Sequence, residues 1–122
     1  METRIKVTTR QVGDVTAVDV AGRVIVGEGS SALGDTLRTL AAKGSKKILV
    51  NLAEVSYIDS SGIGELVSGF NTISKVSGQL KLTGLSKRVK DLLLITKNYA
   101  IFDVHADEAS AIVSFTSPRR EG

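Results

Sequence analysis

The feature of this chain that most constrains its fold is a short apolar run that leads, through a polar turn, into a long amphipathic segment. Residues 48–52 read Ile-Leu-Val-Asn-Leu, and a short run rich in branched side chains is typical of a strand buried on both faces. Beyond the turn at residues 58–64, apolar side chains recur at positions 63, 66, 67, 70 and 73, a spacing that lines one face of an α-helix. A buried strand followed directly by a helix indicates an α/β domain.

The rest of the chain alternates strand-like and helix-like segments in the same way. Further strands are predicted at residues 5–9, 18–20, 80–82 and 101–104, and further helices from Ser30 or Ser31 to Lys43, from Ser86 to Thr96 and from Asp107 to Val113. The first two strands should pair as an antiparallel hairpin across Gly13-Asp14. Residues 22–29 are expected to form a connector, in which residues 24–26 could add a short strand.

These segments predict a single α/β domain over residues 1–115, with a mixed sheet of about four to five strands and about four helices. A flexible tail is predicted for residues 116–122, which contain Pro118 and Arg119-Arg120. No internal repeat is visible in the sequence.

Composition favours a small globular domain that uses neither disulfides nor thiolate metal ligands. The 122 residues are 42% hydrophobic and 24% charged, which suits one core and argues against a disordered chain. Cysteine is absent from the sequence. No apolar run reaches the length of a membrane span, and the first residues lack the apolar region of a signal peptide. We therefore expect a cytoplasmic protein without membrane insertion.

The charge of the chain gives little support to a nucleic-acid partner. The formal net charge of +3 is spread over separate segments, at residues 46–47, 87–90 and 119–120. Dispersed positive charge is typical of a solvated surface, and an aromatic content of 4% leaves few rings for stacking bases. We expect no direct binding of nucleic acid.

Polar residues stand where the central helix is predicted to begin. The first N–H groups of a helix have no partner inside it, so Asp59, Ser60 or Ser61 can cap them. A phosphate on either serine would meet the same donors, which makes the turn a candidate anion site. Capping alone does not explain Gly62 and Gly64, since each is about 1 kcal/mol worse than alanine inside a helix. The absence of their side chains would leave the hydroxyls open to a partner's surface.

The sequence Asp59-Ser60-Ser61-Gly62-Ile63-Gly64, with the strand before it and the segment 78–82 after its helix, resembles the STAS domain family, in particular the bacterial anti-sigma factor antagonists. The resemblance runs from about Ile5 to about Val113. In that family a serine-kinase anti-sigma factor phosphorylates the serine that directly follows the aspartate. The matching residue is Ser60, with Ser61 as the second candidate. The unphosphorylated antagonist binds the kinase and frees the sigma factor, and the phosphorylated antagonist dissociates.

The resemblance implies a regulatory binding protein rather than an enzyme, without a cofactor or metal of its own. Its partners would be the anti-sigma factor serine kinase and a serine phosphatase. The implied partner-binding residues are Asp59, Ser60, Ser61, Gly62, Ile63 and Gly64 in the turn, with Gly22, Arg23 and Val24 in the connector. Many family members carry Gly-x-Leu-Asp in this connector, whereas this chain reads Gly22-Arg23-Val24-Ile25.

The sequence leaves three alternative functions to consider. STAS modules also serve as constitutive interaction subunits of signalling, stress-sensing or transport complexes. A serine hydrolase would need a base, and the only histidine is His105, beside Asp103 and Asp107. Residues 27–32 fit a loose dinucleotide fingerprint, but Glu28 would stand between its glycines where a pyrophosphate must approach. The chain is also too short for the usual paired halves of such a fold.

Overall fold

A computed structural model describes residues 4–116, and within them it contains a five-stranded sheet in the order β1-β2-β3-β4-β5 together with four α-helices. The elements in chain order are β1 (Lys6–Val12), β2 (Val15–Val24), α1 (Glu28–Ala42), β3 (Lys47–Ile58), α2 (Ser60–Lys75), β4 (Gln79–Thr83), α3 (Lys87–Ile95), the 3₁₀ helix η1 (Tyr99–Ile101), β5 (Asp103–His105) and α4 (Glu108–Thr116). The predicted α/β class, sheet size and number of helices are confirmed.

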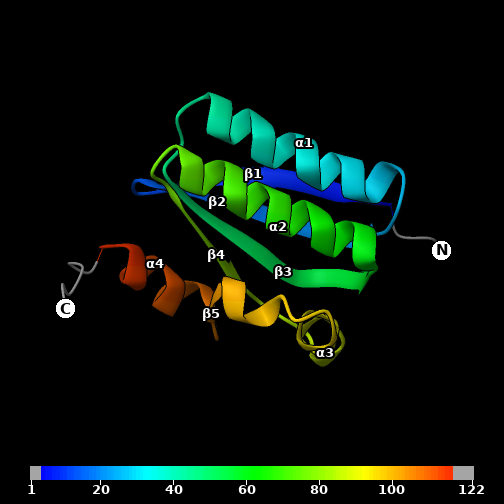
Figure 1. The fold of residues 1–122 in the computed structure, drawn as a ribbon. Helices are drawn as coiled ribbons and strands as arrows, with labels where there is room; N and C mark the ends of the chain where they lie inside the picture. Colours follow the sequence, from blue (N-terminus) through cyan, green and yellow to red (C-terminus); the bar gives the residue numbers. More distant parts are fainter. Residues whose placement is uncertain (1–3, 117–122) are drawn as a thin grey trace.

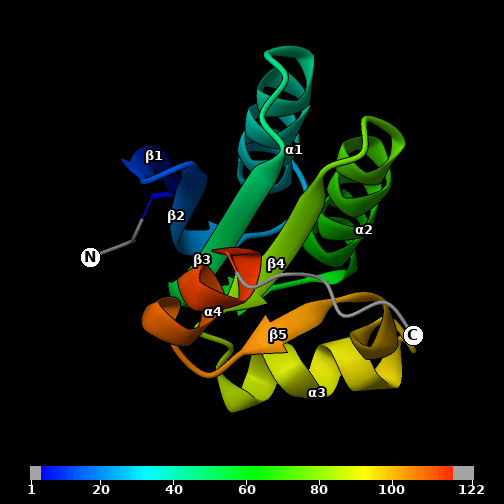
Figure 2. The same ribbon diagram turned by 90° about the vertical axis from the view of Figure 1, so that its left-hand side faces the viewer.

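The sheet is mixed and is covered on both faces. β1 and β2 form the predicted antiparallel hairpin, whereas β2, β3, β4 and β5 pair in parallel. Helices α1 and α2 lie side by side on one face and α4 lies on the other (Figures 1 and 2). No helix within residues 4–116 has both the length and the hydropathy that a membrane span needs.

The two faces of β3 belong to two separate groups of buried side chains. Alternate residues of the strand point toward α1 and α2, among them Ile48, Val50 and Leu52, which are buried in the larger core. Leu49 points the other way and packs in a smaller core with Val15 and with the α4 residues Ala111 and Phe115. This double burial explains why the strand reads as a continuous apolar run.

The helix faces predicted from apolar spacing are the buried ones. In α1 the buried residues include Leu33, Leu37, Leu40 and Ala41. In α2 they include Ile63, Leu66 and Ile73, and Val67 and Phe70 pack half-buried against the same core. Ser86 caps α3 as predicted, since its hydroxyl accepts a hydrogen bond from the Val89 N–H.

Several element boundaries differ from the prediction, among them the following three. β2 continues through Val24, because its last residues pair with the end of β3, so residues 22–24 are strand rather than connector. Helix α1 begins at Glu28 instead of Ser30 or Ser31, because Gly27 adopts a φ of 103° that favours glycine and turns the chain into the helix. Residues 99–101 form η1, and β5 covers only Asp103–His105.

The predicted tail starts at the last residue of α4, Thr116, and residues 117–122 lie outside the described part of the chain. The prediction of a flexible tail is therefore untested.

The attachment of α4 to the sheet should depend on Phe115. Its side chain is buried in the smaller core, so Phe115→Ala is expected to lower the free energy of unfolding by about 3 kcal/mol and to speed amide exchange in α4. Val113 lies on the same helix but is 60% exposed, and Val113→Ala should change stability by about 0.5 kcal/mol or less. Denaturant unfolding of both variants checks this, and equal losses would contradict the packing assigned to Phe115.

Candidate functional site

The serine turn joins the end of β3 to the start of α2, and Asp59 caps the helix. The residue has an extended backbone conformation, and its Oδ1 accepts hydrogen bonds from the N–H groups of Ser61 (2.9 Å) and Gly62 (3.1 Å). Of the three capping candidates in the sequence, the structure therefore selects Asp59. Two otherwise unpaired helix donors are satisfied by one carboxylate oxygen.

The other oxygen of Asp59 reaches the segment that precedes α1. Oδ2 accepts a hydrogen bond from the Val26 N–H at 3.0 Å, and the Asp59 N–H donates to the Val24 carbonyl at 3.2 Å. The end of β2 thus lies directly beside the serine turn. The carboxylate holds two chain segments together that are 33 residues apart.

Opposing effects act on the pKa of Asp59. Partial burial favours the neutral acid, but hydrogen bonds from Ser61, Val26 and Gly62 favour the carboxylate and together prevail. The pKa therefore lies below its usual value. The carboxylate is ionised at neutral pH and contributes a fixed negative charge next to both serines.

The two serines have different environments. The Ser61 hydroxyl donates to Asp59 Oδ1 at 2.5 Å, so its proton is already committed within the turn. The Ser60 side chain is exposed, and its hydroxyl has no hydrogen-bond partner within residues 4–116. A reactant from outside the molecule can therefore reach Ser60 without breaking an existing hydrogen bond.

The two glycines of the turn also have different roles. A Cβ on Gly62 would lie 2.6 Å from Ile58 Cγ1 and 2.7 Å from the Val24 carbonyl oxygen, so only glycine allows α2 to start this close to β2. A Cβ on Gly64 would meet nothing within 4 Å. The suggestion that both glycines keep the serines accessible is therefore wrong for Gly62, which is a packing residue.

The residues predicted to bind a partner fall into three groups by exposure. The exposed ones are Ser60, Gly64 and Arg23, the partly buried ones are Asp59 and Ser61, and the buried ones are Gly22, Val24, Gly62 and Ile63. The structure brings all of them to the same end of the sheet. Direct contact with another molecule is open mainly to the first group.

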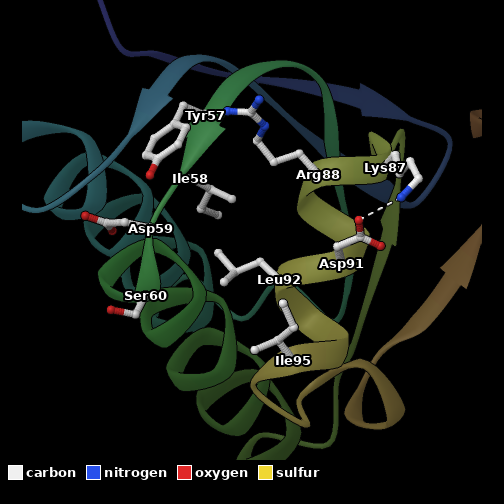
Figure 3. A pocket seen from close by; sticks show the side chains of 9 residues that line it. All are labelled: Tyr57, Ile58, Asp59, Ser60, Lys87, Arg88, Asp91, Leu92 and Ile95. Atoms are coloured by element: carbon white, nitrogen blue, oxygen red, sulfur yellow. Dashed lines mark hydrogen bonds and ion pairs between the residues drawn. The ribbon is translucent and has the colours of Figure 1, made fainter.

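Ser60 also lines a cleft of about 750 Å³ that the sequence did not indicate. One wall is the end of β3 and the serine turn, and the other is α3, as Figure 3 shows. The lining residues are Tyr57, Ile58, Asp59, Ser60, Lys87, Arg88, Asp91, Leu92 and Ile95. One feature of the sequence could have indicated an exposed apolar surface here. Residues Leu92–Ile95 are all apolar, and four consecutive residues of a helix cannot all lie on one buried face.

The alternative chemistries are not assembled around the serines. His105 Nε2 lies 3.1 Å from Asp103 Oδ1 on β5, and neither residue lines the cleft that contains Ser60. Gly29, part of the loose dinucleotide pattern, packs against the Arg23 carbonyl, where a Cβ would be 2.3 Å from the oxygen. Within residues 4–116 no three histidine, aspartate or glutamate side chains are placed to hold a metal ion together.

The fold and the capped serine turn define a STAS domain, and the chain belongs to the STAS domain family, whose model matches residues 6–111. Within that family its relatives include the anti-sigma-B factor antagonist of Bacillus subtilis (strain 168). That protein is 33% identical to this chain over 108 residues, which cover 88% of this chain and 97% of the relative. The chain is thus a member of the anti-sigma factor antagonist group of STAS proteins.

Solved structures of similar proteins share the fold at lower identity. An anti-sigma factor antagonist from Mycobacterium paratuberculosis has a TM-score of 0.83 and 15% identity, over 96% of this chain and 100% of that one. The Bacillus cell fate determinant SpoIIAA in its phosphorylated form has a TM-score of 0.71 and 18% identity, over 90% and 99%. These likenesses confirm the fold assigned above.

Alanine substitutions at the two glycines should have opposite effects. Gly62→Ala is expected to lower the free energy of unfolding by about 1 to 3 kcal/mol, because the new methyl group meets Ile58 and the Val24 carbonyl. Gly64→Ala should leave stability unchanged or raise it by up to about 1 kcal/mol, because alanine is the better helix former. Urea unfolding of the pair is the measurement, and a Gly62→Ala protein as stable as the parent would refute the packing role.

Removal of the Asp59 charge should destabilise the protein in a pH-dependent way. Asp59→Asn keeps an acceptor for the helix but loses the carboxylate, so we expect a loss of about 1 to 2 kcal/mol at pH 7. Because the folded-state pKa of Asp59 is lowered, its stabilisation is present above the unfolded pKa of about 3.9 and disappears as the pH falls through the folded value. The difference in melting temperature between the parent and Asp59→Asn should therefore shrink below about pH 4. A constant difference from pH 7 to pH 2 would count against this assignment.

Proposed function

We propose that this chain binds a serine-kinase anti-sigma factor and that phosphorylation of Ser60 switches this binding off, which regulates transcription by the corresponding sigma factor. The observation that supports this most directly is the contrast between the two serines. Ser60 offers an exposed hydroxyl without a hydrogen-bond partner in residues 4–116, whereas the hydroxyl of Ser61 is bonded to Asp59. The phosphorylated form of SpoIIAA, a structural relative, is consistent with such a switch.

In the proposed reaction the Ser60 oxygen attacks the γ-phosphorus of ATP bound to the kinase. A new Oγ–P bond forms, the bond to the β-phosphate oxygen breaks, and ADP leaves. The kinase would supply ATP, magnesium and the base that takes the hydroxyl proton. Asp59 is a poor candidate for that base, because its two oxygens already accept four hydrogen bonds and its pKa is lowered.

The proposed switch works by charge and bulk rather than by unfolding. A phosphate adds about 1.5 to 2 negative charges near neutral pH. The N-terminus of α2 partly compensates this charge inside the protein, so the fold should persist. In the complex with the kinase, the phosphate on Ser60 would lie beside the ionised Asp59. Its size and charge would remove the contacts that the kinase makes with the free hydroxyl. A serine phosphatase would restore the binding form.

Phosphate transfer with purified candidate kinases tests the proposal. Incubation with ATP and a serine-kinase anti-sigma factor from the same organism should add one phosphate, about 80 Da, to the peptide that contains Ser60. Ser60→Ala should abolish the addition and Ser61→Ala should retain it, as intact-mass measurement can show. Ser60→Asp should weaken the complex with the kinase.

The outcomes of this experiment separate the two functions considered for a STAS protein. Labelling of Ser61→Ala but not of Ser60→Ala supports the switch. Absence of labelling of the parent with every such kinase of the organism would overturn it and favour a constitutive interaction subunit of a signalling, stress-sensing or transport complex.

A further inference from the structure

We propose that the partner docks into the cleft between the serine turn and α3, where it inserts an apolar side chain against Ile95 and places a carboxylate near Arg88. This inference rests on the proposed function and extends it, because it assigns α3 to the docking surface and states the chemistry of the partner's contact. None of the residues of α3 belongs to the predicted binding set around Ser60.

The first argument is the apolar lining of the cleft. Ile58 is buried and Leu92 is partly buried, but Ile95 is 76% exposed and Tyr57 is 40% exposed. Figure 3 shows Ile58, Leu92 and Ile95 facing the space between the two walls. Exposed apolar side chains grouped around a hollow are typical of a surface that another protein covers.

The second argument is the charge that remains after the ion pairs of the cleft are counted. Lys87 Nζ lies 2.9 Å from Asp91 Oδ2, so these two charges offset each other. Asp59 keeps its negative charge, but its oxygens accept four hydrogen bonds from Ser61, Gly62 and Val26, and it forms no ion pair with Arg88. The guanidinium of Arg88 lies over the Tyr57 ring, 5.8 Å from its centre, and no carboxylate is within ion-pair distance of it among residues 4–116. An acidic partner group is the complement of this cation.

The third argument is continuity with the serine turn. Ser60 and Asp59 line the same cleft, and Asp59 also accepts a hydrogen bond from the N–H of Val26, a residue that is 75% exposed. The hydroxyl of Ser60 therefore lies in a surface with exposed apolar residues on both sides, Ile95 of α3 and Val26 of the loop before α1. A phosphate on Ser60 would bring negative charge to the edge of the cleft and repel the carboxylate that Arg88 favours.

Exposed positions on α3 allow a matched test. Ile95→Glu and Arg88→Glu change the cleft, whereas Leu94→Glu adds the same charge as Ile95→Glu at a neighbouring residue that is 50% exposed and does not line the cleft. The probe is the purified kinase that labels Ser60 of the parent, in its ADP-bound form, and isothermal titration calorimetry gives the dissociation constants. We expect Ile95→Glu and Arg88→Glu to weaken binding by about tenfold or more and Leu94→Glu by about twofold or less. Ile95→Leu should restore affinity near that of the parent.

The outcomes distinguish this inference from the proposed function. If no kinase labels the parent chain, the proposed function fails before any α3 variant is compared. If the kinase labels Ser60 and binds the Ile95→Glu and Arg88→Glu proteins as tightly as the parent, the α3 contact is wrong although the switch stands. Equal weakening by Leu94→Glu would also overturn it, because the effect would then be general charge repulsion.

Sedimentation of the chain alone provides a second readout, with circular dichroism to verify that each variant is folded. A monomeric parent supports the proposal. A dimer that Ile95→Glu dissociates, with unchanged affinity for the kinase, would overturn it and assign the cleft to a second copy of the chain.

Discussion

The end of the sheet that carries the serine turn depends on one carboxylate. Asp59 accepts hydrogen bonds from the start of α2 with one oxygen and from Val26 with the other. These bonds join a loop between β2 and α1 to the helix that carries Ser60, and they consume the hydroxyl of Ser61. The accessible hydroxyl at the turn is that of Ser60, which has no hydrogen-bond partner within residues 4–116. It lies next to the negative charge of Asp59. A reversible modification at that hydroxyl can change the surface without removing any of the contacts that hold the turn.

The rest of the fold gives this arrangement a stable base. The first half of β3, residues 48–52, is covered on both sides, by α1 and α2 on one face and by α4 on the other. Its pairing with β2 continues to Ile58, so the strand ends at the same level as the segment before α1. Gly62 then lets α2 begin against the end of β2, where any side chain would collide with the Val24 carbonyl. Stability and the geometry of the proposed site are therefore linked at this glycine, because the close approach that it allows also positions the serines.

Much of the architecture could be predicted from the chain alone, and the reason is local. Apolar spacing in residues 33–41 and 63–73 is a property of each helix, and the double burial of β3 shows in its continuous apolar run. The antiparallel hairpin follows from alternation on both sides of Gly13-Asp14. The errors lie at element ends, among them Val24 and Glu28, where pairing with a distant strand or the conformation of one glycine decides the boundary.

The sequence by itself determined the class of domain, the buried helix faces and the presence of an aspartate and two serines at a helix start. Only the tertiary structure decided which serine is accessible, why Gly62 is a glycine, and that α3 forms the second wall of the cleft beside Ser60. Capping and periodicity act within a few residues, so the sequence displays them directly. The Val26–Asp59 hydrogen bond and the cleft unite residues about 30 positions apart, and such contacts exist only after the sheet has assembled.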